Sequence, residues 1–213
     1  MLRRPYLEIV QDPVGATIDV GTRVTGQHPA LEGILGGCVM VWTHVEAEMA
    51  LFLGHLLGAQ NSVTLAVFQA IRRSNPQRSA LAEAAKLSLD ADDYSLFAAV
   101  FDAHKVLEDE RNALTHGHFG TSTKLPEGLV WMNAKEYLTI PAKMTFTVTP
   151  TWDDDDQIDL LSKLWVYRAV ELQEICDSTK ELSLLWFNSL NGLERLETRA
   201  PRHRKKFGLA STH

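Results

Sequence analysis

Apolar side chains recur at steps of three and four residues over most of the chain between residues 31 and 195. This spacing is typical of helices that bury one face, whereas strands alternate every second residue. The chain has 213 residues, of which 45% are hydrophobic and 23% charged, and this composition is that of a folded globular protein. Because a chain of this length can bury a core without disulfides, we expect one domain, alone or with an appendage.

The helical pattern is interrupted at residues that commonly begin or end helices. Asn75 and Pro76 suit a helix start, and Gly117 is the residue type expected just after a helix end. Asp153–Asp156 would complement the dipole of a last helix that opens at Thr151. The expected helices span about 31–58, 61–73, 75–89, 93–116 and 151–195.

Two short segments depart from the helical pattern. Leu129–Met132 and Met144–Val148 alternate or are β-branched, and a turn-rich stretch separates them. They predict a β-hairpin insertion at about 128–149, before the last long helix. Residues 1–30 are rich in Pro and Gly and predict an irregular arm with one strand at 16–20. The fold class that follows is all-α, a four- to five-helix up-and-down bundle with a small β-hairpin insertion.

Charge is distributed unevenly along the chain. The net charge is −6, but residues 198–213 contain five basic groups and no acid, so the other residues carry a net charge of −11. A body this acidic is a poor general binder of nucleic acid, and any RNA site on it must be local. The basic tail could hold phosphates, or it could dock on the acidic body of a neighbouring copy.

Neither a signal peptide nor an uninterrupted apolar run of membrane-spanning length is evident. The two cysteines are far apart and lie among apolar neighbours, as buried thiols in a reducing compartment do. We therefore expect a cytoplasmic protein without membrane association.

The fourth expected helix carries an unusual arginine. Arg111 falls on the same helical stripe as Leu107 and Leu114, where a guanidinium is costly unless an acceptor pairs with it. Glu46, on the first helix, is a candidate partner. Cations near a helix end are also favoured by the dipole, so Arg111 could be structural.

Beside that stripe, Glu108, Asn112 and His116 recur every fourth residue and form one polar row. On an ideal helix Arg111 and His116 lie about 140° apart around the axis. The side-chain length of arginine, the helix end at Gly117, or a symmetric partner could bring the two together.

Other charged groups are less specific. Arg72, Arg73 and Arg78 gather at the joint between two helices, where they form either an RNA-binding patch or a solvated face. His116 and His118 lack further ligands at a diagnostic spacing, so we expect no metal, and no cofactor motif is present.

The segment Arg111-Asn112-Ala113-Leu114-Thr115-His116 resembles the motif of the HEPN superfamily (higher eukaryotes and prokaryotes nucleotide-binding). The similarity includes the Asn after the Arg, the Gly after the His, and the position late in a long helix. It would extend over residues 31–197, with the β insertion as an unusual addition and 198–213 as a basic tail.

The resemblance implies a metal-independent endoribonuclease that acts as a homodimer. His116 would be the general acid/base, Arg111 would hold the scissile phosphate, and Asn112 would orient His116 or the phosphate. Glu46 and Glu108 are candidate supporting residues. Such enzymes occur as toxins with an antitoxin partner or in phage defence. Many other members are catalytically inactive helical modules that bind a protein or a nucleotide, and a third reading is an unrelated helical dimerisation protein.

Overall fold

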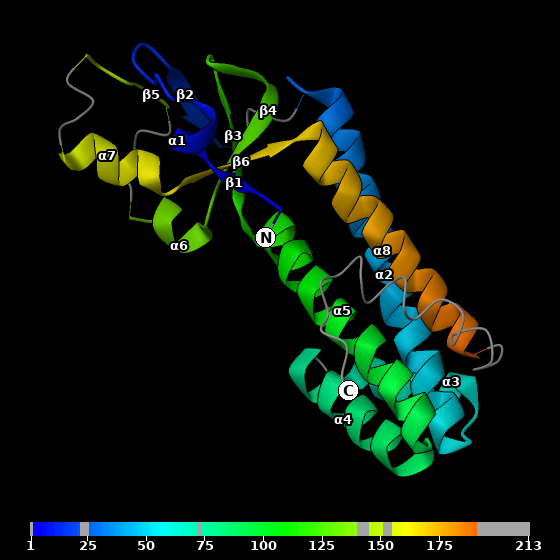
Figure 1. The fold of residues 1–213 in the computed structure, drawn as a ribbon. Helices are drawn as coiled ribbons and strands as arrows, with labels where there is room; N and C mark the ends of the chain where they lie inside the picture. Colours follow the sequence, from blue (N-terminus) through cyan, green and yellow to red (C-terminus); the bar gives the residue numbers. More distant parts are fainter. Residues whose placement is uncertain (1, 22–25, 72–73, 140–144, 151–154, 191–213) are drawn as a thin grey trace. The chain divides into compact units, whose positions relative to one another are not determined.

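The computed structural model describes residues 2–21, 26–71, 74–139, 145–150 and 155–190 (Figure 1). The chain divides into two units: unit 1 is Met1–Val39 with Asp109–Asp177, and unit 2 is Met40–Glu108 with Ser178–His213. This division differs from the predicted domain boundaries. Each change of unit falls inside a helix, and the three helices are α2 (Pro29–Leu57), α5 (Ala91–His116) and α8 (Ala169–Leu190).

Unit 1 is built around an antiparallel sheet of six strands in the order β1-β6-β4-β3-β2-β5. Strands β3 and β4 form a hairpin directly after α5, while β1 and β6 pair although they lie near opposite ends of the unit's sequence. The strands are β1 (Arg4–Pro5), β2 (Thr17–Val20), β3 (His118–Ser122), β4 (Leu125–Met132), β5 (Thr145–Thr147) and β6 (Leu164–Arg168).

Three short helices lie beside this sheet in Figure 1: α1 (Tyr6–Ile9), α6 (Ala134–Tyr137) and α7 (Asp155–Ser162). The core here combines alternate strand residues with side chains of α1 and α7, including Ile18, Val130 and Leu161. Tyr6 is fully buried, and its hydroxyl shares a 2.7 Å hydrogen bond with Ser122. The bond satisfies a polar group that burial would otherwise penalise.

Unit 2 is helical. It combines parts of α2, α5 and α8 with two complete helices, α3 (Asn61–Ala70) and α4 (Ser74–Ser88). Its core is centred on Phe52, Phe97 and Trp186, whose ring centroids lie 5.3–6.0 Å apart. Such aromatic pairs stabilise beyond their buried area.

The first four predicted helices are confirmed as α2, α3, α4 and α5. Asp90 caps the start of α5: its carboxylate accepts a 2.9 Å hydrogen bond from the backbone N–H of Asp93. The predicted strand at 16–20 is confirmed as β2.

The all-α fold class is wrong, because unit 1 contains a six-stranded sheet. The two segments predicted to form a hairpin are strands β4 and β5, but they do not pair with each other. β4 lies between β3 and β6, and β5 pairs with β2. The hairpin partner of β4 is β3, which includes Gly120.

The predicted last helix is also wrong over its middle. The chain forms α7, then strand β6, and only then α8. The sequence of β6, Leu-Trp-Val-Tyr-Arg, is aromatic and β-branched, and it lies between β1 and β4 in the sheet. The helical spacing of the flanking residues concealed this short strand.

Helix α2 is long and apolar enough, by length and composition, to cross a membrane, and it is alone in this among the helices described. The sequence has no uninterrupted apolar run of that length, but the mean hydropathy of α2 is 1.2 over a window of 18 residues. Core helices of soluble proteins satisfy the same criterion, so the composition of α2 is compatible with a soluble protein.

Candidate functional site

The predicted motif occupies the last two turns of α5. Arg111 is partly buried, and its Nη1 donates a 3.0 Å hydrogen bond to Oδ1 of Asn112. The hydroxyl of Thr115 donates to the backbone carbonyl of Arg111 at 3.0 Å, so it points back along the helix. The structure therefore brings the first two motif side chains together through the Asn112 carboxamide.

His116 is the last residue of α5, and its side chain is exposed. Helical geometry places it about 140° around the axis from Arg111. Within one helix the two side chains therefore leave on different sides. Their joint action on one phosphate stays a prediction, and it calls for a second copy or for the reach of the arginine.

The turn that carries the motif is held at its end by Trp131. The indole Nε1–H of Trp131, on β4, donates a 2.9 Å hydrogen bond to the backbone carbonyl of Ala113. A Cβ at Gly117 would lie only 1.8 Å from that same indole nitrogen, so glycine is required here for close approach. The glycine at this helix end thus has a packing reason.

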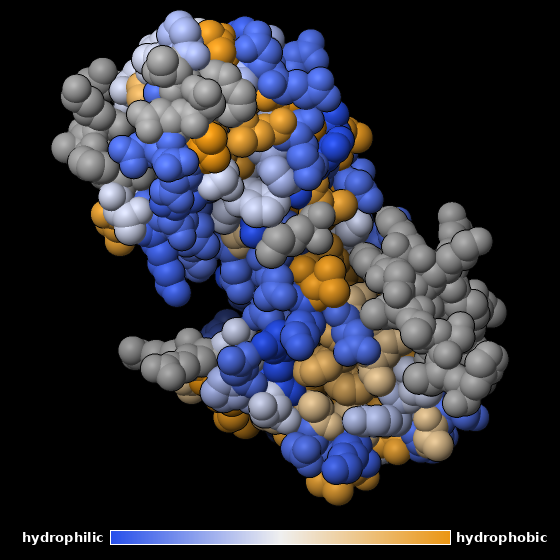
Figure 2. All heavy atoms as spheres, turned by 60° about the vertical axis from the view of Figure 1, so that its left-hand side comes forward, coloured by the Kyte–Doolittle hydropathy of each residue, from blue (hydrophilic) through white to orange (hydrophobic). Residues whose placement is uncertain are grey.

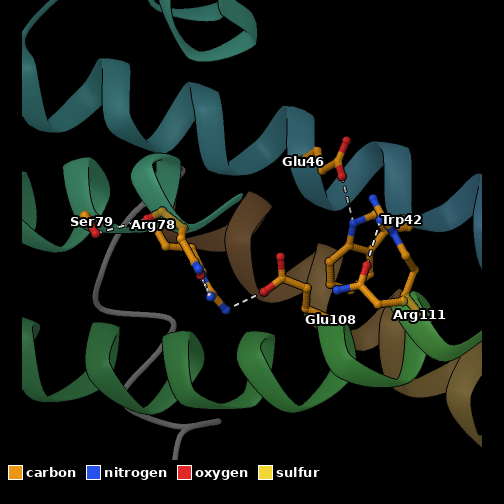
Figure 3. A network of polar contacts seen from close by, with 8 residues as sticks. Trp42, Glu46, Arg78, Ser79, Glu108 and Arg111 are labelled. Carbon is orange, nitrogen blue, oxygen red and sulfur yellow. Dashed lines mark hydrogen bonds and ion pairs between the residues drawn. The ribbon is translucent and has the colours of Figure 1, made fainter. Parts of the chain in front are cut away.

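The predicted supporting residues Glu46 and Glu108 both lie in unit 2, together with Arg78 (Figure 3). The Arg78 guanidinium forms an ion pair with Glu108 and also donates to Oδ1 of Asn75. Glu46 accepts a 2.9 Å hydrogen bond from the indole nitrogen of Trp42. Glu108 is 5% exposed, so its charge depends on the arginine that neutralises it.

These side chains line a small pocket of about 20 Å³, which is room for a water-sized group. His104 and Trp42 also line it, and their rings lie 5.1 Å apart. Arg78, which the sequence offered for RNA binding, is thus engaged with acceptors of its own unit. Arg72 and Arg73 lie outside the described residues, as does the basic tail. The pairing of Arg111 with Glu46 stays a prediction.

Sequence reasoning missed a second polar cluster in unit 1, formed by Arg3, Glu110, Trp131 and Tyr167. Glu110 is 4% exposed and accepts hydrogen bonds from the backbone N–H of Leu2 at 3.2 Å and from the Tyr167 hydroxyl at 3.4 Å. The signal that could have found the cluster is Glu110, an acid directly before Arg111 in the sequence.

The pKa of the Tyr167 hydroxyl is strongly shifted by its surroundings. Burial raises the pKa of the Tyr167 hydroxyl to about 12, the nearby Glu110 carboxylate adds to the rise, and the Arg3 guanidinium works against it. Tyr167 therefore stays a neutral hydrogen-bond donor at physiological pH.

Among the described residues, no group of three or more His, Cys, Asp and Glu side chains is arranged to hold a metal ion. His118 instead stacks on Tyr137, with ring centroids 3.7 Å apart. Comparison with family models, with curated proteins and with solved structures finds no match for this chain. The resemblance to HEPN proteins accordingly rests on the motif and its helix.

Proposed function

We propose that this protein is a HEPN-like, metal-independent endoribonuclease that acts as a dimer in the cytoplasm. The observation that carries the proposal is the placement of Arg111, Asn112 and His116 on the final turns of a 26-residue helix. There the arginine is hydrogen-bonded to Asn112, and the histidine is exposed. Both properties suit the roles that the motif implies: a fixed cation for a phosphate and an accessible acid/base.

In this mechanism His116 removes the proton from a ribose 2′-hydroxyl, and the 2′-oxygen attacks the adjacent phosphorus. The bond from phosphorus to the 5′-oxygen breaks, and an imidazolium, supplied by His116 of the second copy, protonates the leaving oxygen. Arg111 stabilises the charge that builds on the phosphoryl oxygens, and Asn112 orients the guanidinium. The products are a 2′,3′-cyclic phosphate and a 5′-hydroxyl.

The acidic body restricts where RNA can lie. The described part of the chain offers no excess of positive charge, so contacts would be local, at Arg111 and the predicted Arg72 and Arg73, doubled by dimer symmetry, with the basic tail as a sequence-independent hold on phosphates. A toxin of this kind would pair with an antitoxin or another protein partner.

A second candidate function is a catalytically inactive helical module that binds a protein. Its support is the set of apolar side chains that unit 2 leaves exposed, among them Val63 and Val67 on α3 and Leu184 and Phe187 on α8. Figure 2 shows such hydrophobic side chains at the surface among hydrophilic ones. Nothing in this candidate requires His116.

The test is RNA cleavage in the presence of EDTA by the wild type, by His116→Ala and by His55→Ala. His55 is a matched control because it is also exposed in the last turn of a helix. We expect His116→Ala to lose about 10²–10⁴-fold in cleavage rate and His55→Ala to match the wild type. Equal cleavage by all three proteins, or cleavage by none, would refute the ribonuclease and leave the binding module.

A further inference from the structure

Near the start of the sequence, the Arg3 side chain lies among three aromatic residues of unit 1. We call these residues, Trp131, Trp165 and Tyr167, the cage. The Arg3 guanidinium carbon lies 4.1 Å from the ring centroid of Trp131 and 5.5 Å from that of Trp165. Its Nη1 donates to the Tyr167 hydroxyl at 3.2 Å. Cation–π contacts of this kind grow stronger when water is excluded, and Trp131 and Tyr167 are both buried.

The same arm also contacts α5. The backbone N–H of Leu2 donates a hydrogen bond to the Glu110 carboxylate, which also accepts one from the Tyr167 hydroxyl. Beyond Arg3, the arm is joined to the sheet as β1, which pairs only Arg4 with Val166 and Pro5 with Trp165. A two-residue strand is a weak attachment, so the contacts of Arg3 add to the hold on residues 2–5, while the buried Tyr6 anchors the residues that follow.

The cage connects to the motif turn at two positions of α5 and at Gly117, the residue directly after it. Glu110 precedes Arg111 directly, the Ala113 carbonyl accepts from Trp131, and Gly117 packs against the same indole. Glu110 and Gly117 bracket the segment from Arg111 to His116, and Ala113 lies within it. A shift of the Trp131 ring would therefore also move the last turns of α5, which carry the motif side chains.

We propose that Arg3 is a positioning residue for the motif turn: its guanidinium holds the Trp131 indole, which sets the end of α5 and with it Arg111 and His116. The consequence for RNA cleavage rests on the proposed function. The positioning itself does not, because it concerns contacts between the arm, the sheet and α5.

The cage should be specific for a guanidinium. A planar guanidinium stacks on indole rings and donates in a fixed fork, whereas the compact ammonium of lysine is more strongly hydrated and lacks the plane. Arg3→Lys therefore keeps the positive charge but removes the planar guanidinium that stacks on the indole rings. Arg4→Ala is the matched control, because Arg4 is the adjacent arginine and its side chain forms an exposed ion pair with Glu8 at 3.5 Å.

The experiment measures amide hydrogen exchange of the full chain by NMR, at the backbone N–H of Gly117 and the indole N–H of Trp131. The Gly117 N–H donates to Ala113, so it reports the motif turn directly. We expect exchange at both groups to accelerate about tenfold in Arg3→Ala and in Arg3→Lys, and to stay at the wild-type rate in Arg4→Ala. Millimolar ethylguanidinium should restore protection to Arg3→Ala, whereas ethylammonium should not.

Unchanged exchange in Arg3→Ala and Arg3→Lys would overturn the proposal. So would faster exchange spread over the whole sheet and not rescued by ethylguanidinium, because that result describes a purely structural arm. If the wild type cleaves RNA, Arg3→Ala should also lower kcat with little change in KM. If the wild type does not cleave RNA, the proposed function fails while the exchange and rescue results still decide the role of Arg3.

Discussion

Helix α5 is fixed in two different ways along its length. Its part in unit 2 is held by rings: Phe97 packs on Phe52 and Trp186, and His104 packs on Trp42. Its last turns, in unit 1, are held by directed contacts to Glu110, the Ala113 carbonyl and Gly117. Ring packing contributes much stability but little direction, whereas a few hydrogen bonds fix how a turn is rotated. Substitutions in the ring-packed part should therefore mainly lower the stability of the fold, whereas substitutions in the last turns should mainly change the local structure of the motif.

The largest effect is expected in the ring-packed part. Trp186 is 1% exposed, and Trp186→Ala should lower the free energy of unfolding by about 3–5 kcal/mol, because it leaves a cavity among aromatic side chains. Urea unfolding followed by circular dichroism measures it. The adjacent Phe187 is 50% exposed, so Phe187→Ala should cost less than about 1 kcal/mol. Similar losses in the two variants would contradict the role given to the rings.

A smaller but more local effect is expected at Gly117. Its replacement by alanine forces the Trp131 indole away from the Ala113 carbonyl and should cost about 1–3 kcal/mol. Trp131 fluorescence and RNA cleavage should both change. Gly36→Ala is the control, because a Cβ there meets nothing within 4 Å and a helical glycine is replaced by a better helix former. If the two alanine variants behave alike, the close contact does not fix the turn.

The smallest effect concerns the hydroxyl of Tyr167. Its pKa is about 12 in the folded protein, above the value near 10 of an exposed tyrosine. The neutral hydroxyl therefore contributes stability that is complete below about pH 10 and is lost as pH rises toward 12. Tyr167→Phe should cost about 1 kcal/mol at neutral pH and show a flatter decline in this alkaline range. Unfolding curves of both proteins across that range provide the measurement, and parallel declines would count against the assignment.

Local spacing was enough to predict α2 to α5, because amphipathic periods and cap residues act within one helix. It failed for β6, whose Leu164 and Trp165 continue the helical spacing from Leu161. What makes that segment a strand is pairing with β1 and β4, which are remote in sequence. For the candidate site, spacing selected Arg111, Asn112 and His116. It could not show that Arg3 and Trp131 meet, because a cation–π contact has no sequence period.

The pairing of Arg4 with Val166 also has a consequence for biosynthesis. Ribosomes add about 5–20 residues per second, so the first strand waits roughly 10–30 s for its neighbour to be made. During that interval the β3–β4 hairpin can already form and pair with β2, but β1 has no strand to join. A nascent chain stalled before β6 should therefore expose Arg4 and Pro5 to proteases, and completion of β6 should be the step that protects them.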